Sequence, residues 1–410
     1  MSQSCAHAAA LTCWSGELVH NRAAHMAEKI IQQPESGAGT GEIARAFLRL
    51  GFIAFGGTAA HIAMMEDEFV RRRGWLTRER FLDLVGAVNL LLGPSSTELA
   101  IYLGQIRGGV PGLLAAGAAF ILPAAAMVAG LAWAYMRYGA LPQVAGILFG
   151  VKPVVVVLIA QAVWSLARTA LKLKELAFLA AVVVVLAALR VSTVALLIGT
   201  GVAWIVAQRP GGGWRVAAGA TGTAAATGAV TGGIVAGSSI LLYFVKVGAV
   251  LVGSGYVLLA VLRADLVVRL HWLTEAQLLD AVAVSQVTPG PFFTVATFIG
   301  YVLAGWKGAA LATAGIFLPA FAYVAATARF LPKLRQSPTA AAFLDGVNAA
   351  AVALMAFVGF QFARASLLSA PAAVICAISA LLLFRYRVNS AWLVLFGAAA
   401  GAVFKLLRLA

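Results

Sequence analysis

Residues 89–104 read NLLLGPSSTELAIYLG, an apolar stretch with glycine and proline near its centre. Proline removes a backbone donor and glycine relaxes the helix, so this stretch is predicted to divide into two half-helices at Gly93 and Pro94. A second stretch, QVTPGPFFTVATFIG at 286–300, carries the same Gly-Pro break. Two similar breaks in one chain suggest an internal repeat.

The surrounding sequence confirms that repeat. In one register the matched pairs include Phe47 with Phe244, Gly51 with Gly248, Trp75 with Trp272, Asp83 with Asp280 and Pro94 with Pro291. One residue is then lost, after which Gly104 falls on Gly300 and Pro123 on Pro319. Chance similarity between apolar stretches would match Leu and Ala, whereas these matches are Trp, Pro, Asp and Gly. The chain therefore has two homologous halves.

The composition places these halves in a membrane. The 410 residues are 62% hydrophobic and 11% charged, against about 45–50% and about 25% in soluble domains. The three cysteines lack metal-ligand spacing, so disulfides and cysteine metal sites receive little weight. The net charge of +15 comes from basic residues scattered in short loops, which favours a membrane protein over a nucleic acid partner. We expect an all-α polytopic membrane protein without metal or cofactor.

Apolar segments of about 20 residues, long enough to cross a bilayer, follow in close succession. The candidate spans are 43–64, 111–136, 143–167, 176–190, 191–208, 239–262, 309–328, 340–363, 371–384 and 390–406. The Gly-Pro segments 81–105 and 276–304 either span or re-enter. The predicted organisation is a polar tail (1–42), an N-terminal half (43–209), a Gly/Ala/Thr-rich linker (210–238) and a C-terminal half (239–410).

The basic loops indicate how the halves are oriented. In the first half they gather at 71–80 and 168–174, and in the second at 329–335 and 385–387, which are not the repeat-equivalent positions. Because basic loops stay in the cytosol, each half must cross the membrane an odd number of times. Five crossings per half, with the Gly-Pro segment as a re-entrant hairpin, satisfy this rule. The halves are predicted to form an inverted, antiparallel repeat.

The two breaks predict an anion site. Non-helical backbone at membrane depth is tolerated only where protein or water covers it. The half-helix that follows each break offers free N–H groups and a positive dipole end to an anion. An ordinary proline kink is the alternative, but two equivalent breaks favour binding. The residues predicted to form this site are Gly93, Pro94, Ser95, Ser96, Thr97, Thr288, Pro289, Gly290, Pro291 and Thr294.

Cations inside apolar segments are further candidates for binding the anion. Arg49 and Lys246 occupy equivalent positions, and a cation within a membrane helix costs a few kcal/mol, which favours a function. Snorkelling from the helix start is the alternative explanation. Lys152 lies near the start of an apolar run, and its repeat partner is the neutral donor Asn348.

Four titratable groups are candidates for proton coupling: His61, Glu98, Asp83 and Asp280. The two aspartates are paired by the repeat, and a first-turn position in a helix is the competing explanation for them. His61 and Glu98 have no charged repeat partner. For these two, the alternative is a buried polar residue whose hydrogen bonds are satisfied.

Several motifs resemble the chromate ion transporter family. FLRLGFIAFGG (47–57), EDEFVRRRGWL (66–76) and FILPA (120–124) are similar to its N-terminal half, and QVTPGPFFTVATFIGY (286–301) with FLPA (317–320) to its C-terminal half. The resemblance covers residues 43–407 and departs where the family's first Pro-Gly-Pro is Leu92-Gly93-Pro94 here. It carries functional roles over to Arg49, Gly56, Gly57, His61, Gly93, Pro94, Gly290 and Pro291.

The resemblance implies a two-domain, long-chain member that exports chromate from the bacterial cytoplasm, coupled to the proton-motive force. An inside-negative potential favours moving each negative charge outward by about 2.3 kcal/mol per 100 mV. The expected partners are chromate, protons and the lipid bilayer of the bacterial cytoplasmic membrane, with a homodimer left open. Uptake or exchange of sulfate or another oxyanion is the nearest alternative. An intramembrane lipid-phosphate enzyme is more remote, because the sequence shows no nucleophile or metal cluster for it.

Overall fold

The computed structural model describes residues 39–88, 93–139, 141–189, 191–208, 237–251, 257–327 and 338–407. Most of the predicted tail, nearly all of the linker and the basic loop at 329–335 lie outside these residues. Within the described part every regular element is helical. The chain therefore folds as predicted in its secondary-structure class.

The helices follow the same order in both halves. The first half contains α2 (Thr40–Ile53), α3 (Thr58–Glu66), the π-helix η1 (Asp67–Arg72), α4 (Arg78–Val88), α5 (Ser95–Tyr138), α6 (Pro142–Ala170), α7 (Lys174–Ala188) and α8 (Thr193–Ala207). The second contains α9 (Gly237–Val250), α10 (Val257–Leu262), the π-helix η2 (Arg263–Arg269), α11 (Glu275–Val287), the short 3-10 helix η3 (Phe292–Thr294), α12 (Val295–Thr327), α14 (Pro338–Ser366), α15 (Ala370–Tyr386) and α16 (Ser390–Leu406).

Two predicted spans, 43–64 and 239–262, are each divided between two helices. The sequence predicted a continuous helix over 43–64, but α2 ends at Ile53 and α3 begins at Thr58. Gly56 lies in the gap with a φ of 110°, which helical backbone does not allow. In the second span, α9 ends at Val250 and α10 begins at Val257. The predicted breaks at the Gly-Pro segments are confirmed, because α4 and α11 both end before the Gly-Pro pair and α5 and η3 begin after it.

Beyond each break, the helix folds back on itself. The backbone of α5 leaves helical geometry at Gly108 and Gly109, where the φ of Gly109 is 59°. Ile101 then packs against Gly117, a contact that a straight helix forbids at a rise of about 1.5 Å per residue. In α12 the same reversal occurs at Gly305, and the hydroxyls of Thr297 and Thr313 meet at 2.7 Å. Both helices are therefore hairpins with a short and a long arm.

The repeated glycines have a packing role. A Cβ on Gly51 of α2 would lie 2.9 Å from the carbonyl oxygen of Phe120 in α5. A Cβ on Gly248 of α9 would lie 2.4 Å from that of Ile316 in α12. These are equivalent crossings in the two halves, and each allows a short helix to lie directly on the long arm of the hairpin.

The later helices of each half pack against helices of the other half. α6 packs against α15 and α16 of the second half, and α14 packs against α7 and α8 of the first. The contact surfaces are again equivalent, since Gly150 of α6 touches Gly397 and Gly401 while Gly346 of α14 touches Thr200 and Gly201. Each half therefore completes the packing of the other.

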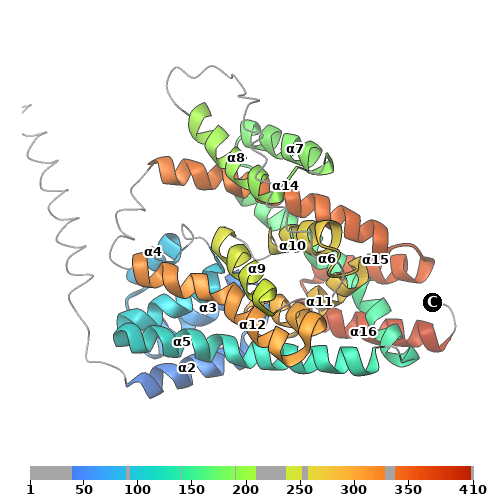
Figure 1. The fold of residues 1–410 in the computed structure, drawn as a ribbon, viewed down its shortest axis with the longest axis horizontal. Helices are drawn as coiled ribbons and strands as arrows, with labels where there is room; N and C mark the ends of the chain where they lie inside the picture. The colour runs from blue at the N-terminus through green and yellow to red at the C-terminus, as the bar shows by residue number, and fades with distance from the viewer. Residues whose placement is uncertain are drawn as a thin grey trace, which may run out of the picture.

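Equivalent helices run in opposite directions. In Figure 1, α5 ends beside α6 at the right, whereas α12 ends at the left, on the side where α14 begins. The two helices pack against each other. Antiparallel equivalents are the relation that an inverted repeat requires.

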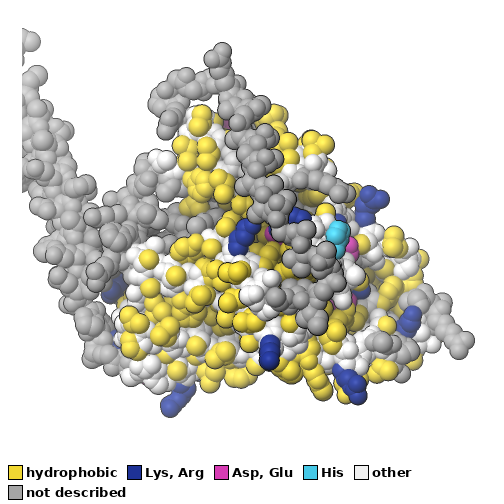
Figure 2. All heavy atoms as spheres, viewed as in Figure 1, with side chains coloured by type: hydrophobic (Ala, Val, Ile, Leu, Met, Phe, Trp, Pro, Cys, Tyr) yellow, Lys and Arg dark blue, Asp and Glu magenta, His cyan; other side chains and the backbone are white. Residues whose placement is uncertain are grey.

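The outer surface suits a bilayer. Four helices in the described part of the chain are long and apolar enough to cross a membrane: α5, α6, α12 and α14, and α8, α9, α15 and α16 are shorter apolar helices. Hydrophobic side chains cover much of the face shown in Figure 2, with basic side chains lying singly among them. Trp164 and Trp392 are 58% and 68% exposed. The chain is a multi-pass membrane protein.

We predict that reporter fusions at 168–174 and at 329–335 will both lie on the cytosolic side. A fusion at Arg364, the repeat equivalent of Arg168, should lie on the opposite side, because an inverted repeat places equivalent loops on opposite faces. Paired alkaline phosphatase and fluorescent protein fusions would measure this. Arg168 and Arg364 on one side would contradict the inverted arrangement.

Candidate functional site

A backbone hydrogen bond joins the second-half break to the gap between α2 and α3 in the first half. The N–H of Gly290, in the Gly-Pro break after α11, donates to the carbonyl of Ala54 at 2.7 Å. Ala54 caps the end of α2 in the first half. Gly290 has a φ of 101°, and a Cβ there would lie 2.5 Å from that of Ala124 in α5. The second-half break is therefore fitted tightly against the first half.

His61 of α3 lies at the same junction. Its side chain is 2% exposed, with Nε2 at 3.1 Å from the carbonyl oxygen of Ala54 and Nδ1 at 3.3 Å from Oγ of Ser96. A carbonyl only accepts, so Nε2 donates and, in the neutral ring, Nδ1 accepts from the Ser96 hydroxyl. His61 thus links the end of α2 to the start of α5.

Glu98 is a fully buried carboxyl beside the first break. Its exposed fraction is 0%, and neither carboxyl oxygen has a hydrogen-bond partner among the described residues. The missing side chain of Gly93 makes room for it, because a Cβ there would lie 2.4 Å from Oε1. Burying an ionised carboxylate without a partner is very costly, so this environment favours the protonated form. The carboxyl lies against Gly93, two residues before α5 begins at Ser95, which is where an anion is expected.

The second break is less polar than the first. The hydroxyl of Thr288 donates to the carbonyl of Val284 at 2.5 Å, and that of Thr294 to the carbonyl of Pro291 at 2.9 Å. Phe292 and Phe293 stand where the first half has Ser95 and Ser96. The hydroxyls predicted to bind an anion here are already used by the backbone, so the two breaks are unequal.

An ion pair connects the halves away from the breaks. Nζ of Lys152 in α6 lies 3.3 Å from Oδ1 of Asp280 in α11, and the Tyr135 hydroxyl donates to Oδ2 at 3.1 Å. The first-turn explanation is wrong for Asp280, because α11 begins at Glu275 and Asp280 is buried in its second turn. Its repeat equivalent Asp83 is exposed on α4 and also lies in the second turn, because α4 begins at Arg78, so the first-turn explanation is wrong for both.

The predicted cations do not lie at the Gly-Pro breaks. Arg49 and Lys246 are exposed. Gly51 faces α5, and two residues correspond to about 200° around a helix, so Arg49 lies on the opposite side of α2. Each cation instead lines a pocket that also contains an acidic residue of the adjacent π-helix, Glu68 or Asp265.

Lys152 is in the ion pair with Asp280, and Asn348 is partly buried on α14. Gly57 precedes α3. Sequence reasoning missed Tyr135, for which no signal existed. It also missed Glu68 and Asp265, although these two align in the register that pairs Arg49 with Lys246. Among the described residues, no three His, Cys, Asp or Glu side chains are grouped so that they could hold a metal ion.

Comparison with known proteins agrees with the repeat. A family model described as Chromate transporter matches residues 41–205 and again 238–402. A chromate transport protein of Cupriavidus metallidurans is 34% identical over 360 residues, which cover 86% of this chain and 90% of that protein. One from Pseudomonas aeruginosa is 34% identical over 325 residues, 75% of this chain and 77% of that protein.

A shorter relative corresponds to one half. The uncharacterized transporter YwrA of Bacillus subtilis is 32% identical over 127 residues, which cover 31% of this chain but 71% of that protein. No solved structure matches the chain.

We predict that Asp280→Asn will lower the free energy of unfolding by about 3 kcal/mol, because it leaves the ammonium of Lys152 without its carboxylate. Thermal unfolding of the purified protein in detergent would measure this. The matched control is Asp345→Asn at an exposed position of α14, expected to change stability by about 0.5 kcal/mol or less. Equal effects would mean that the ion pair does not stabilise the contact between the halves.

Proposed function

Because this chain belongs to the chromate transporter family, we propose that it is a secondary transporter that exports chromate from the bacterial cytoplasm in exchange for protons. Resistance to chromate would follow from that export. The observation that supports the exchange is the buried Glu98 carboxyl beside the α5 N-terminus, which has no hydrogen-bond partner in the part of the chain that the structure describes.

The α5 N-terminus is the proposed anion site. Ser95 begins the helix immediately after Pro94, so its first N–H groups and the positive end of the helix dipole face the break. Thr97 adds a buried hydroxyl oxygen without a partner among the described residues. The Ser96 hydroxyl, now bound to His61, becomes a donor to an anion if the ring takes up a proton, because a protonated ring no longer accepts.

Glu98 and the anion compete for one place in this proposal. The carboxyl occupies the space beside Gly93 while it carries a proton. When chromate arrives at the helix N-terminus, the side chain moves toward water, where the ionised form is stable and the proton is released. Anion binding then expels a proton, and proton binding expels the anion. Alternation between the two gives exchange, and the membrane potential favours the outward movement of the dianion.

We predict that Glu98→Gln will remove the response of chromate flux to a pH gradient, because the amide keeps the shape of the side chain but cannot carry the proton. The measurement is labelled chromate flux in inverted membrane vesicles, with and without an imposed gradient. Glu79→Gln, an exposed position on α4, is the matched control and should respond as the wild type does. A full response in Glu98→Gln would show that another group carries the proton.

The unequal breaks generate a second prediction. Pro94 alone holds the first break, so Pro94→Ala should let α5 extend toward α4 and cover the amides that face the anion. Pro291→Ala retains Pro289 and the hydrogen bond from Gly290 to Ala54, so its loss should be smaller. Chromate resistance of cells, at matched membrane abundance, should fall further in Pro94→Ala. The reverse order would identify the second break as the main anion site.

The nearest alternative is uptake or exchange of sulfate, another tetrahedral dianion. The same vesicles distinguish it from chromate export. Flux of labelled sulfate that exceeds chromate flux and runs into the cytoplasm would contradict the proposal.

A further inference from the structure

Two pockets in the described part of the chain are related by the repeat. One lies between α2, α3 and η1, and the other beside α9, α10 and η2. Their linings contain matched residues at five equivalent positions: Arg49 with Lys246, Leu50 with Val247, Ile53 with Val250, Met64 with Val261 and Glu68 with Asp265. Each pocket therefore combines a cation of the first helix with an acid of the π-helix. We call them the Arg49 pocket and the Lys246 pocket.

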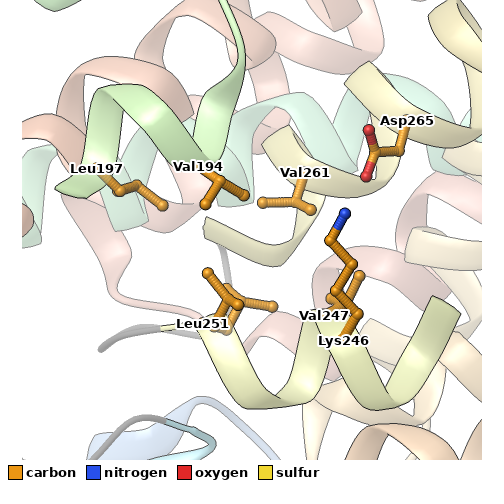
Figure 3. A pocket seen from close by; sticks show the side chains of 8 residues that line it. Val194, Leu197, Lys246, Val247, Leu251, Val261 and Asp265 are labelled. Carbon is orange, nitrogen blue, oxygen red and sulfur yellow. The ribbon is translucent and has the colours of Figure 1, made fainter. Parts of the chain in front are cut away.

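The two pockets differ in volume. The Arg49 pocket has a volume of about 270 Å³ and the Lys246 pocket one of about 20 Å³. Val194 and Leu197 of α8 lie against the Lys246 pocket (Figure 3). The described lining of the Arg49 pocket comes only from α2, α3 and η1. Helix α8 thus closes the Lys246 pocket. Among the described residues, its counterpart α16 does not line the Arg49 pocket.

The charges in the two pockets are also arranged differently. In the Arg49 pocket, Glu68 pairs with Arg73 at 2.7 Å, and no ion pair of Arg49 occurs among the described residues. In the Lys246 pocket, the ammonium points toward the carboxylate of Asp265 and acts on it electrostatically (Figure 3). Leu270 stands where the first half has Arg73. In both pockets the acid pairs with an arginine at the end of the π-helix, since Asp265 pairs with Arg269 at 3.2 Å. In the closed pocket the cation of the first helix also points toward the acid.

We propose that the two pockets are oxyanion vestibules on opposite faces of the membrane, opened in turn, with Arg49 and Lys246 as the cation that meets the anion on each side. This rests on the proposed transport function. The structure has the Arg49 vestibule open and the Lys246 vestibule closed by α8. In the alternate state, Arg49 turns toward Glu68 and α16 closes over it, while α8 withdraws and Lys246 is released.

The packing of each half's last helix on the other half allows the two vestibules to open in turn. α8 packs on α14, and α16, its counterpart, packs on α6. Gly346 contacts Thr200 and Gly201 in the first pair, and Gly150 contacts Gly397 and Gly401 in the second. Small residues form both contacts, so α8 can slide on α14 and α16 can slide on α6 in the same way. An inverted repeat that exchanges the conformations of its halves produces the opposite-facing state.

The test measures the accessibility of single cysteines at equivalent positions. In a background without Cys5, Cys13 and Cys376, Met64→Cys and Val261→Cys are labelled with a membrane-impermeant maleimide in membranes open on either side. Met64→Cys should react from one side only, and Val261→Cys should react more slowly and from the other side. Adding Lys246→Ala should speed labelling at 261 and slow it at 64, each by about tenfold, because opening one vestibule closes the other.

Lys307→Ala, an exposed lysine outside both pockets, is the matched control and should change neither rate. If Lys246→Ala leaves the rate at position 64 unchanged, or raises it together with the rate at 261, the pockets are independent and the proposal is overturned. The maleimide reports access without reference to any transported ion. Absence of chromate flux in the wild type would therefore count against the proposed function, while the reciprocal rates would still support alternating vestibules.

Arg49→Ala adds a second readout. It should abolish chromate flux and leave the protein in the membrane, whereas Arg49→Lys should retain part of the flux, because an ammonium keeps the charge but lacks the fork of donors. Wild-type flux in Arg49→Ala would show that the guanidinium only reaches for the membrane surface, and would overturn its assigned contact with the anion.

Discussion

Backbone polar groups cannot stay unpaired in apolar surroundings, and the architecture around the breaks follows from that constraint. A broken membrane helix exposes amides and carbonyls. Here one half supplies the partner for the other, since the Gly290 amide donates to the carbonyl of Ala54. The imidazole of His61 binds the same carbonyl and reaches Ser96 at the start of α5. The irregular backbone that could receive an anion is thus held at the contact between the halves.

The repeat supplies a common frame, and substitutions within it give the halves different chemistry. The glycines at helix crossings and hairpin turns recur because both halves need the same close approaches. The first break has serines, a buried glutamate and a histidine nearby, whereas the second has two phenylalanines and threonines bound to their own backbone. In the proposed exchange, the first half therefore supplies the polar groups. The second break serves mainly to fit the two halves together.

The exchange of helices makes the halves mechanically dependent. α6 is completed by α15 and α16, and α14 by α7 and α8. The proposed movement of α8 away from the Lys246 pocket would therefore change its contact with α14, which belongs to the other half. The ion pair between Lys152 and Asp280 also crosses from one half to the other. Such links favour concerted change over independent motion of each half.

The sequence by itself determined the membrane class, the two homologous halves and the Gly-Pro breaks, because these depend on hydropathy, proline chemistry and register. It did not predict the gap after Ile53, since no proline marks it and two glycines within a helix are often tolerated. Only the tertiary structure decided that Asp280 meets Lys152, that Arg49 lies away from the breaks and that α8 and α16 pack against helices of the opposite half. These features depend on which helix faces pack together, and apolar faces of similar composition do not encode their partners in local sequence.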